Sequence, residues 1–180
     1  MVSVVQAMFK KSFTGTAFIL GDHVNTDILH PPDYFSLKKD TIASGLSKGA
    51  EDFISKMGRD DIIVAGRNFG CGSSRESSAR SFAYNGIKVI VAESFARIFY
   101  RNLTNQGIYL ITCPGIVKTA EQGEPISIDL EKNEISSQRR DWRLDCTPLP
   151  GYIKSVLEKG GLIKFLEDQI SINKLNHRGH

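Results

Sequence analysis

Short apolar runs alternate with amphipathic stretches over the first two thirds of the chain. Runs rich in Ile, Val, Phe and Thr predict strands at 13–20, 61–65, 87–92 and 108–112. Apolar positions three or four residues apart predict helices at 39–47, 50–57 and 95–105, and another that begins near Ser73 and ends at Asn85-Gly86. This order of elements predicts an α/β domain in which helices join successive strands.

The last third of the chain has a different pattern. Short strands separated by turn residues are predicted at 125–130, 134–136 and 142–146. A helical pattern follows at 152–158, is interrupted at Gly160-Gly161 and resumes through Phe165. We therefore expect a single domain over residues 1–170 and a frayed polar tail over residues 171–180.

A long segment without regular periodicity joins the first strand to the first helix. Residues 21–38 contain Asn25, Pro31, Pro32 and Asp33, which are turn formers, and show neither a helical nor a strand period. Loops of this length inside compact domains are usually functional or mobile. We therefore expect this segment to be either functional or mobile.

Length, charge and cysteine content narrow the classes of function. The 180 residues leave room for one domain with a tail. A net charge of +3 does not indicate nucleic acid or an anionic membrane as partner. No run approaches the roughly 18 apolar residues of a membrane span. The cysteines, Cys71, Cys113 and Cys146, form neither a disulfide framework nor a zinc motif, so we expect a soluble cytoplasmic protein without a metal site.

A glycine-rich turn carries the strongest chemical signal. Gly66, Gly70 and Gly72 lie between a predicted buried strand and a predicted helix, where glycine allows positive φ and close approach to a ligand. Backbone N–H groups and the positive end of the helix dipole then favour an anion. Between Gly66 and Arg101 there are six basic residues and two acidic ones. The turn is therefore predicted to bind an anion.

Other interpretations of this turn remain open. Ser73 and Glu76 have the spacing of a capping box, which satisfies helix N–H groups without any ligand. A nucleotide site is disfavoured because the Lys-Ser/Thr pair of a P-loop is absent. Cys71 has the position of a nucleophile, but neither His23 nor His30 has a spacing that identifies it as a base.

Three segments together resemble the small subunits of the aconitase-type dehydratases. They are GRNFGCGSSRE (66–76), IKVIVAESFARIFYRNLTNQGI (87–108) and GDHVNTDIL (21–29). The resemblance implies a three-layer β/β/α swivel domain that is active only with a large subunit. It also implies that this partner carries a [4Fe–4S] cluster, that this chain holds no cofactor, and that the complex dehydrates and rehydrates a small 2-hydroxy acid. The match is closest to the isopropylmalate enzymes of leucine biosynthesis.

The resemblance also implies roles for residues at matching positions. Ser73 would be the catalytic base, Ser74 and Arg75 would hold a substrate carboxylate, and Thr26 with Asp27 would orient the site. A serine hydroxyl is a very weak acid, so it can act as a base only where dipoles and a cation stabilise its anion. Asp27 is also explained by a simple Asx-type turn. Arg97 and Arg101, four residues apart, fit either a solvated helix face or a contact with the partner.

The chain departs from the family pattern at two places. Arg75-Glu76-Ser77 stands where the family has Arg-Glu-His, and Tyr34-Phe35-Ser36-Leu37 stands where the isopropylmalate enzymes have Tyr-Leu-Arg-Thr. The second segment is the predicted specificity loop, and Ser36 cannot supply the charge of an arginine. Homoaconitate-like, dimethylmalate-like and methylmalate-like substrates therefore remain open beside isopropylmalate. A stand-alone carboxylate-binding module is an alternative from another functional class.

Overall fold

Seven strands form one continuous sheet in the computed structural model, which describes residues 9–48, 53–58, 60–73 and 75–176. The strands are β1 (Ser12–Ile19), β2 (Asp61–Ala65), β3 (Val89–Ala92), β4 (Tyr109–Thr112), β5 (Pro125–Asp129), β6 (Glu134–Ser137) and β7 (Trp142–Asp145). The helices are α1 (Thr26–Leu29), η1 (Pro32–Tyr34), α2 (Lys39–Lys48), α3 (Phe53–Lys56), α4 (Glu76–Tyr84), α5 (Arg97–Asn105), α6 (Ile116–Thr119), α7 (Gly151–Glu158) and α8 (Leu162–Asn176).

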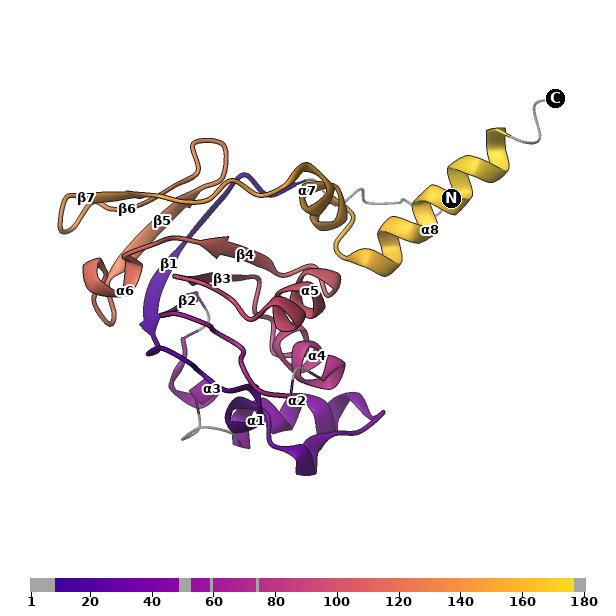
Figure 1. The fold of residues 1–180 in the computed structure, drawn as a ribbon, viewed down its shortest axis with the longest axis horizontal. Helices are drawn as coiled ribbons and strands as arrows, with labels where there is room; N and C mark the ends of the chain where they lie inside the picture. The colour runs from indigo at the N-terminus through magenta and orange to yellow at the C-terminus, as the bar shows by residue number, and fades with distance from the viewer. Residues whose placement is uncertain (1–8, 49–52, 59, 74, 177–180) are drawn as a thin grey trace.

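The sheet has a parallel half and an antiparallel half. Its strand order is β4-β3-β2-β1-β5-β6-β7, in which β1 to β4 pair in parallel and β5 to β7 pair antiparallel. Strand β1 belongs to both halves, because it pairs with β2 on one side and β5 on the other. The sheet curls there, so that β5, β6 and β7 lie in a separate layer above β2 and β3 (Figure 1).

Burial on both faces of the parallel strands produces the three layers. In β2, Ile62 and Val64 pack in a core shared with the antiparallel strands, which includes Ile128. The intervening Ile63 and Ala65 pack in a second core shared with the helices on the opposite face. Side chains alternate between the two faces of a strand, so this run of apolar residues supplies both cores. The predicted three-layer β/β/α arrangement is confirmed.

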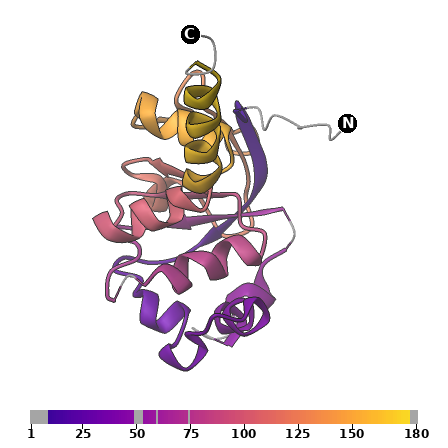
Figure 2. The same cartoon turned by 90° about the vertical axis from the view of Figure 1, so that its right-hand side faces the viewer.

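The helical layer covers the second core. Phe69, Phe82 and Phe99 are fully buried there and meet with ring centroids 5.6 to 6.3 Å apart. Such tilted and edge-to-face pairs are favourable aromatic geometries. Figure 2 looks onto this layer, with α8 (yellow) above α5 and α4. The phenylalanines hold α4 and α5 firmly against the sheet, at the ends of the loops described below.

The first long loop and the C-terminal tail contain more helix than predicted. The segment 21–38, expected to lack regular elements, contains α1 and η1, because the Asn25 side chain accepts a hydrogen bond from the Asp27 N–H and caps α1 locally. Helix α8 continues to Asn176 through part of the expected tail. Its first turn is anchored by Phe165, whose ring meets Tyr152 edge to face at 5.8 Å, and it extends away from the sheet (Figure 1). Among the described helices, none combines the length and apolar content needed to cross a membrane.

Candidate active site

Three loops meet at the carboxyl ends of the parallel strands β1, β2 and β3. The N–H of Gly70 donates to the carbonyl of Val24 at 2.9 Å, which joins the loop after β2 to the loop after β1. The N–H of Phe69 donates to the carbonyl of Ser94 at 2.9 Å, which joins the same loop to the one after β3. Ligands of α/β sheets bind at this edge. The motifs that carry the family resemblance are therefore brought together in space.

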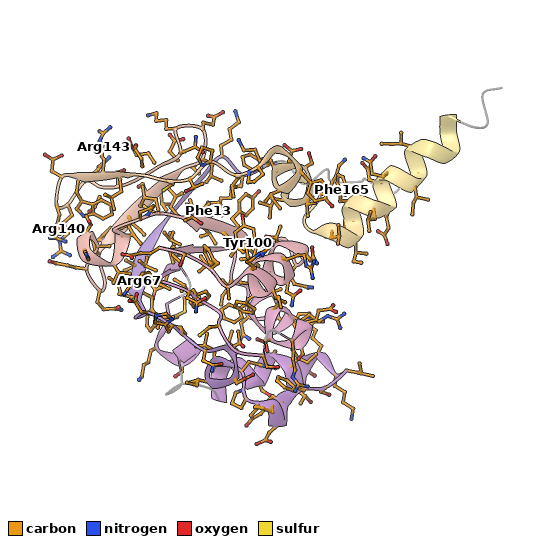
Figure 3. The ribbon with its side chains drawn as sticks, viewed as in Figure 1. Phe13, Arg67, Tyr100, Arg140, Arg143 and Phe165 are labelled. Carbon is orange, nitrogen blue, oxygen red and sulfur yellow. The ribbon has the colours of Figure 1, made fainter. Side chains whose placement is uncertain are left out.

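A bidentate ion pair also holds the first two loops together. Arg67, labelled in Figure 3, donates from its backbone N–H to Asp22 Oδ1 and from Nη2 to Asp22 Oδ2, both at 2.7 Å. These backbone and side-chain hydrogen bonds hold the pKa of the Asp22 carboxyl below its usual value. The pair is solvent-exposed, so its main effect is on the register of the loops rather than on stability.

The turn after β2 needs its glycines for different reasons. Gly70 and Gly72 have φ of +81° and +100°, in the left-handed region. A Cβ on Gly70 would overlap the Phe99 ring, and one on Gly72 would overlap the Asn25 side chain. Gly66 has no positive φ, but a Cβ there would overlap the carboxylate of Asp22. The close approach of the loops thus depends on all three positions.

The helix that follows the turn begins later than predicted, at Glu76. Its N-cap is Arg75, and no side chain caps it. The capping-box interpretation of Ser73 and Glu76 is therefore wrong, because Glu76 pairs instead with Arg80 one turn further along, at 2.7 Å. Ser73 is free of a capping role and precedes the helix. Ser74 lies outside the described residues.

Ser73, Arg75 and Asp27 meet in front of this helix. The Nε of Arg75 donates to Ser73 Oγ at 3.3 Å, and the Ser73 N–H donates to Asp27 Oδ2 at 3.3 Å. The second carboxylate oxygen, Asp27 Oδ1, is buried and has no hydrogen-bond partner among the described residues. A buried acceptor without a donor is costly, so this oxygen is open to a donor from outside the described residues. The Asx-type turn expected at Asp27 is formed by Asn25 instead, because the Asn25 side chain accepts a hydrogen bond from the Asp27 N–H.

The side chains of Thr26 and Cys71 form hydrogen bonds between loops, whereas the Ser73 side chain is exposed. Thr26 is only 1% exposed, and its hydroxyl donates to the carbonyl of Cys71 at 3.3 Å. The Cys71 thiol donates to the carbonyl of His23 at 3.2 Å, and the His23 ring contacts Asn68 rather than the thiol. This geometry offers Cys71 no base and does not favour thiol chemistry.

The predicted specificity loop, residues 34–37, lies beside Arg75. The Arg75 guanidinium is 4.5 Å from the centre of the Phe35 ring. Ser36 Oγ accepts a hydrogen bond from the Lys38 N–H at 3.1 Å, while Leu37 is 96% exposed. The loop therefore presents an aromatic ring, a hydroxyl and an apolar side chain near the candidate site, without a charged group at position 36.

Sequence reasoning missed a buried histidine under this loop. His30 is fully buried. Its Nε2 lies 3.0 Å from the Ile42 carbonyl, which can only accept, so Nε2 carries the proton and Nδ1 is left to accept from Ser78 Oγ at 3.4 Å. Burial disfavours the imidazolium and lowers the pKa of His30 below its usual value. His30 lies in a sequence segment that has neither a helical nor a strand period, so no pattern of apolar positions indicated that its side chain is buried.

We expect the stability of the chain to fall on mild acidification because of His30. In the unfolded chain His30 takes up a proton near pH 6.5, whereas the folded chain resists it to lower pH. The stabilisation is complete above that pH and is lost as the pH falls toward the lowered pKa of the folded state. Urea unfolding at pH 7, 6 and 5 should show a smaller decrease for His30→Gln than for the wild type. An equal decrease in the wild type and in His30→Gln would contradict the assignment.

Within the described residues, no group of three or more His, Cys, Asp or Glu side chains could hold a metal ion.

Arg97 and Arg101 are exposed on α5. Arg97 lines a cavity of about 420 Å³ beside the third loop, together with Ser94 and Tyr100. The exposure of both arginines is compatible with a solvated face and with a partner contact, so the two interpretations remain.

Comparison with known proteins identifies the family. Residues 43–115 match the aconitase C-terminal domain family. The chain is 37% identical to the 3-isopropylmalate dehydratase small subunit 1 of Methanopyrus kandleri over 155 residues, 85% of this chain and 91% of the relative. The chain belongs to the small subunits of the aconitase-type dehydratases. The resemblance seen in the motifs is thereby confirmed.

Two further members of this small-subunit family are informative. The methanogen homoaconitase small subunit of Methanothermobacter thermautotrophicus is 42% identical over 83% of this chain and 87% of its own length. The crystal structure of a 3-isopropylmalate dehydratase from Methanocaldococcus jannaschii superposes with a TM-score of 0.83 at 36% identity, covering 92% of this chain and 99% of that one. The small-subunit fold is therefore present in full, while the names of the relatives include more than one substrate.

Proposed function

We propose that this chain is the small subunit of a hydro-lyase that isomerises 2-isopropylmalate to 3-isopropylmalate by dehydration and rehydration in leucine biosynthesis. The observation that carries the proposal is the contact of Ser73 Oγ with the Arg75 guanidinium, on a turn that is tied to Asp27. The names of relatives such as that of Methanopyrus kandleri support the reaction. The cytoplasm is the proposed location, which the three free cysteines support.

Ser73 is proposed as the base that removes the carbon-bound proton. Its hydroxyl accepts from a guanidinium that keeps its charge at any physiological pH, and this favours the alkoxide form of the serine. Positive backbone dipole at the start of α4 adds to the same effect. Arg75 and Ser74 are proposed to bind a substrate carboxylate. Asp27 would orient the site through its bond to the Ser73 N–H, and Thr26 through its bond to the loop that carries Ser73.

The proposal requires a large partner subunit with a [4Fe–4S] cluster. That cluster would supply the Lewis acid for the hydroxyl that leaves and returns. Ser73 and Arg75 are exposed in the isolated chain, as expected for half of a site that a partner completes. Asp27 Oδ1 has no hydrogen-bond partner among the described residues, which supports a donor contributed by the substrate or by the partner.

The residues around Arg75 favour a dicarboxylate with an apolar substituent. The specificity loop lacks the expected arginine and offers Phe35, Ser36 and Leu37. The apolar side chains of Phe35, beside Arg75, and of the exposed Leu37 fit the alkyl substituent of isopropylmalate, although the loop lacks the arginine of the isopropylmalate enzymes. Homoaconitate remains the second candidate because a homoaconitase small subunit is 42% identical.

Ser36→Arg should shift the preference of the complex toward isopropylmalate, because the isopropylmalate enzymes that this chain resembles have an arginine at this position. A charge-assisted hydrogen bond contributes about 1.5–3 kcal/mol, so the ratio of kcat/KM for isopropylmalate over homoaconitate should rise about tenfold or more. Ser36→Gln, which adds length without charge, is the matched control and should leave the ratio nearly unchanged. Equal ratios in both variants would remove position 36 from substrate selection.

Anaerobic affinity purification of the tagged chain from its source cells tests the proposed function. We expect a brown complex that contains a second, larger subunit and hydrates one of the three candidates isopropylmaleate, homoaconitate and dimethylmaleate in preference to the others. A colourless single chain that binds carboxylates without turnover, even after cluster reconstitution, would instead support the binding-module alternative.

A further inference from the structure

The Phe35 ring contacts two different side chains. The Arg75 guanidinium lies over it at 4.5 Å, and the His30 ring lies 5.4 Å from it, centre to centre, with an interplanar angle of 30°. Among the described residues, no carboxylate forms an ion pair with Arg75. Its position is therefore set by the Phe35 ring and by Ser73 Oγ, which leaves the guanidinium's ion-pairing capacity for a ligand.

His30 gives the Phe35 ring a rigid support. The imidazole bridges α2 and α4, through the carbonyl of Ile42 and the hydroxyl of Ser78. Gly45 in α2 allows this packing, because a Cβ there would lie 2.5 Å from the His30 ring. His30 is thus fixed from two helices, and it cannot rotate away from Phe35 without losing both hydrogen bonds.

We propose that Phe35 is a positioning residue for Arg75, and that the stack on His30 holds the guanidinium where it can bind both Ser73 and the substrate carboxylate. This inference rests on the proposed function for the roles of Ser73 and Arg75. A long arginine side chain has many rotamers, and a ring that holds it beforehand lowers the entropy lost on binding substrate.

Nuclear magnetic resonance of the full chain tests the contact without the partner. The Nε–Hε signal of Arg75, identified by its loss in Arg75→Lys, should show a ring-current shift that disappears in Phe35→Leu and is retained in Phe35→Tyr. Phe35→Leu keeps an apolar side chain and so separates the ring from simple burial. An unchanged Arg75 signal in a folded Phe35→Leu chain would overturn the positioning role.

Kinetics of the reconstituted complex test the consequence. An exposed cation–π contact corresponds to about a two- to fivefold change in affinity. Phe35→Leu should therefore raise KM and lower kcat/KM by about that factor or more, because Arg75 also contacts Ser73, and Phe35→Tyr should restore the wild-type values. In an Arg75→Gln background the same substitution should have no further effect on KM.

The outcomes separate the two proposals. If Phe35→Leu costs the same with and without Arg75, Phe35 acts on the substrate directly and the positioning role is wrong. If the wild-type complex turns over none of the hydroxy acids while the Arg75 signal still responds to Phe35→Leu, the proposed function fails and the Phe35–Arg75 contact stands.

Discussion

Replacing Ser73 by alanine should lower turnover of the reconstituted complex by about a hundred- to ten-thousandfold. That is the usual contribution of a positioned base, and the structure offers no second oxygen in the same contact with Arg75 among the described residues. Single-turnover kinetics of the anaerobic complex measure the effect on the proton-transfer step itself. KM should change far less than kcat, because the hydroxyl is needed mainly when the proton moves.

Assembly has to be preserved for this result to be interpretable. Ser73 is exposed, and among the described residues its side chain bonds to Arg75 alone, so the alanine variant should copurify with the large subunit in normal yield. Ser171→Ala is the matched control, since its hydroxyl bonds only within α8, to the Glu167 carbonyl. Near-normal turnover of a fully assembled Ser73→Ala complex would remove Ser73 from the role of base.

Local patterns predicted the parallel half of the sheet and the position of the glycine turn. The apolar runs at 61–65 and 108–112 coincide with β2 and β4 within one residue, because buried parallel strands carry apolar residues on both faces. The three short strands of the last third are also confirmed. Local patterns could not predict how these strands fold back over the parallel half, because that depends on packing between residues as distant as Ile62 and Ile128. Only the family resemblance indicated the three layers.

The contacts within the candidate site lie beyond local patterns for the same reason. Phe35 and Arg75 are forty positions apart, and His30 reaches Ser78 across a similar separation. No period or spacing relates such residues. The capping box failed for a related reason: Ser73 bonds through its N–H to Asp27 of another loop, and this contact holds it outside the helix. Family motifs located the residues, and only the fold shows how they act on one another.

Gly72→Ala should lower the activity of the complex because the new Cβ displaces Asn25, in addition to the strain of a left-handed backbone. Gly72 has a φ of +100°, and a Cβ there would overlap the side chain of Asn25, which caps α1 and fixes Asp27. Gly86→Ala is the matched control, because Gly86 also has a positive φ, +80°, but a Cβ there would meet nothing within 4 Å. Both variants should lose about 1–2 kcal/mol of stability from the left-handed backbone.

Only Gly72→Ala should also lose catalysis, by about a hundredfold or more in kcat, since displacement of Asn25 moves Asp27 away from the Ser73 N–H. Urea unfolding of the two chains and turnover of the two complexes make the comparison. Similar losses of stability with turnover reduced in Gly72→Ala alone would show that the approach of the first loop to the turn is what aligns Ser73. Equal turnover in the two variants would mean that Asn25 and Asp27 do not align the base.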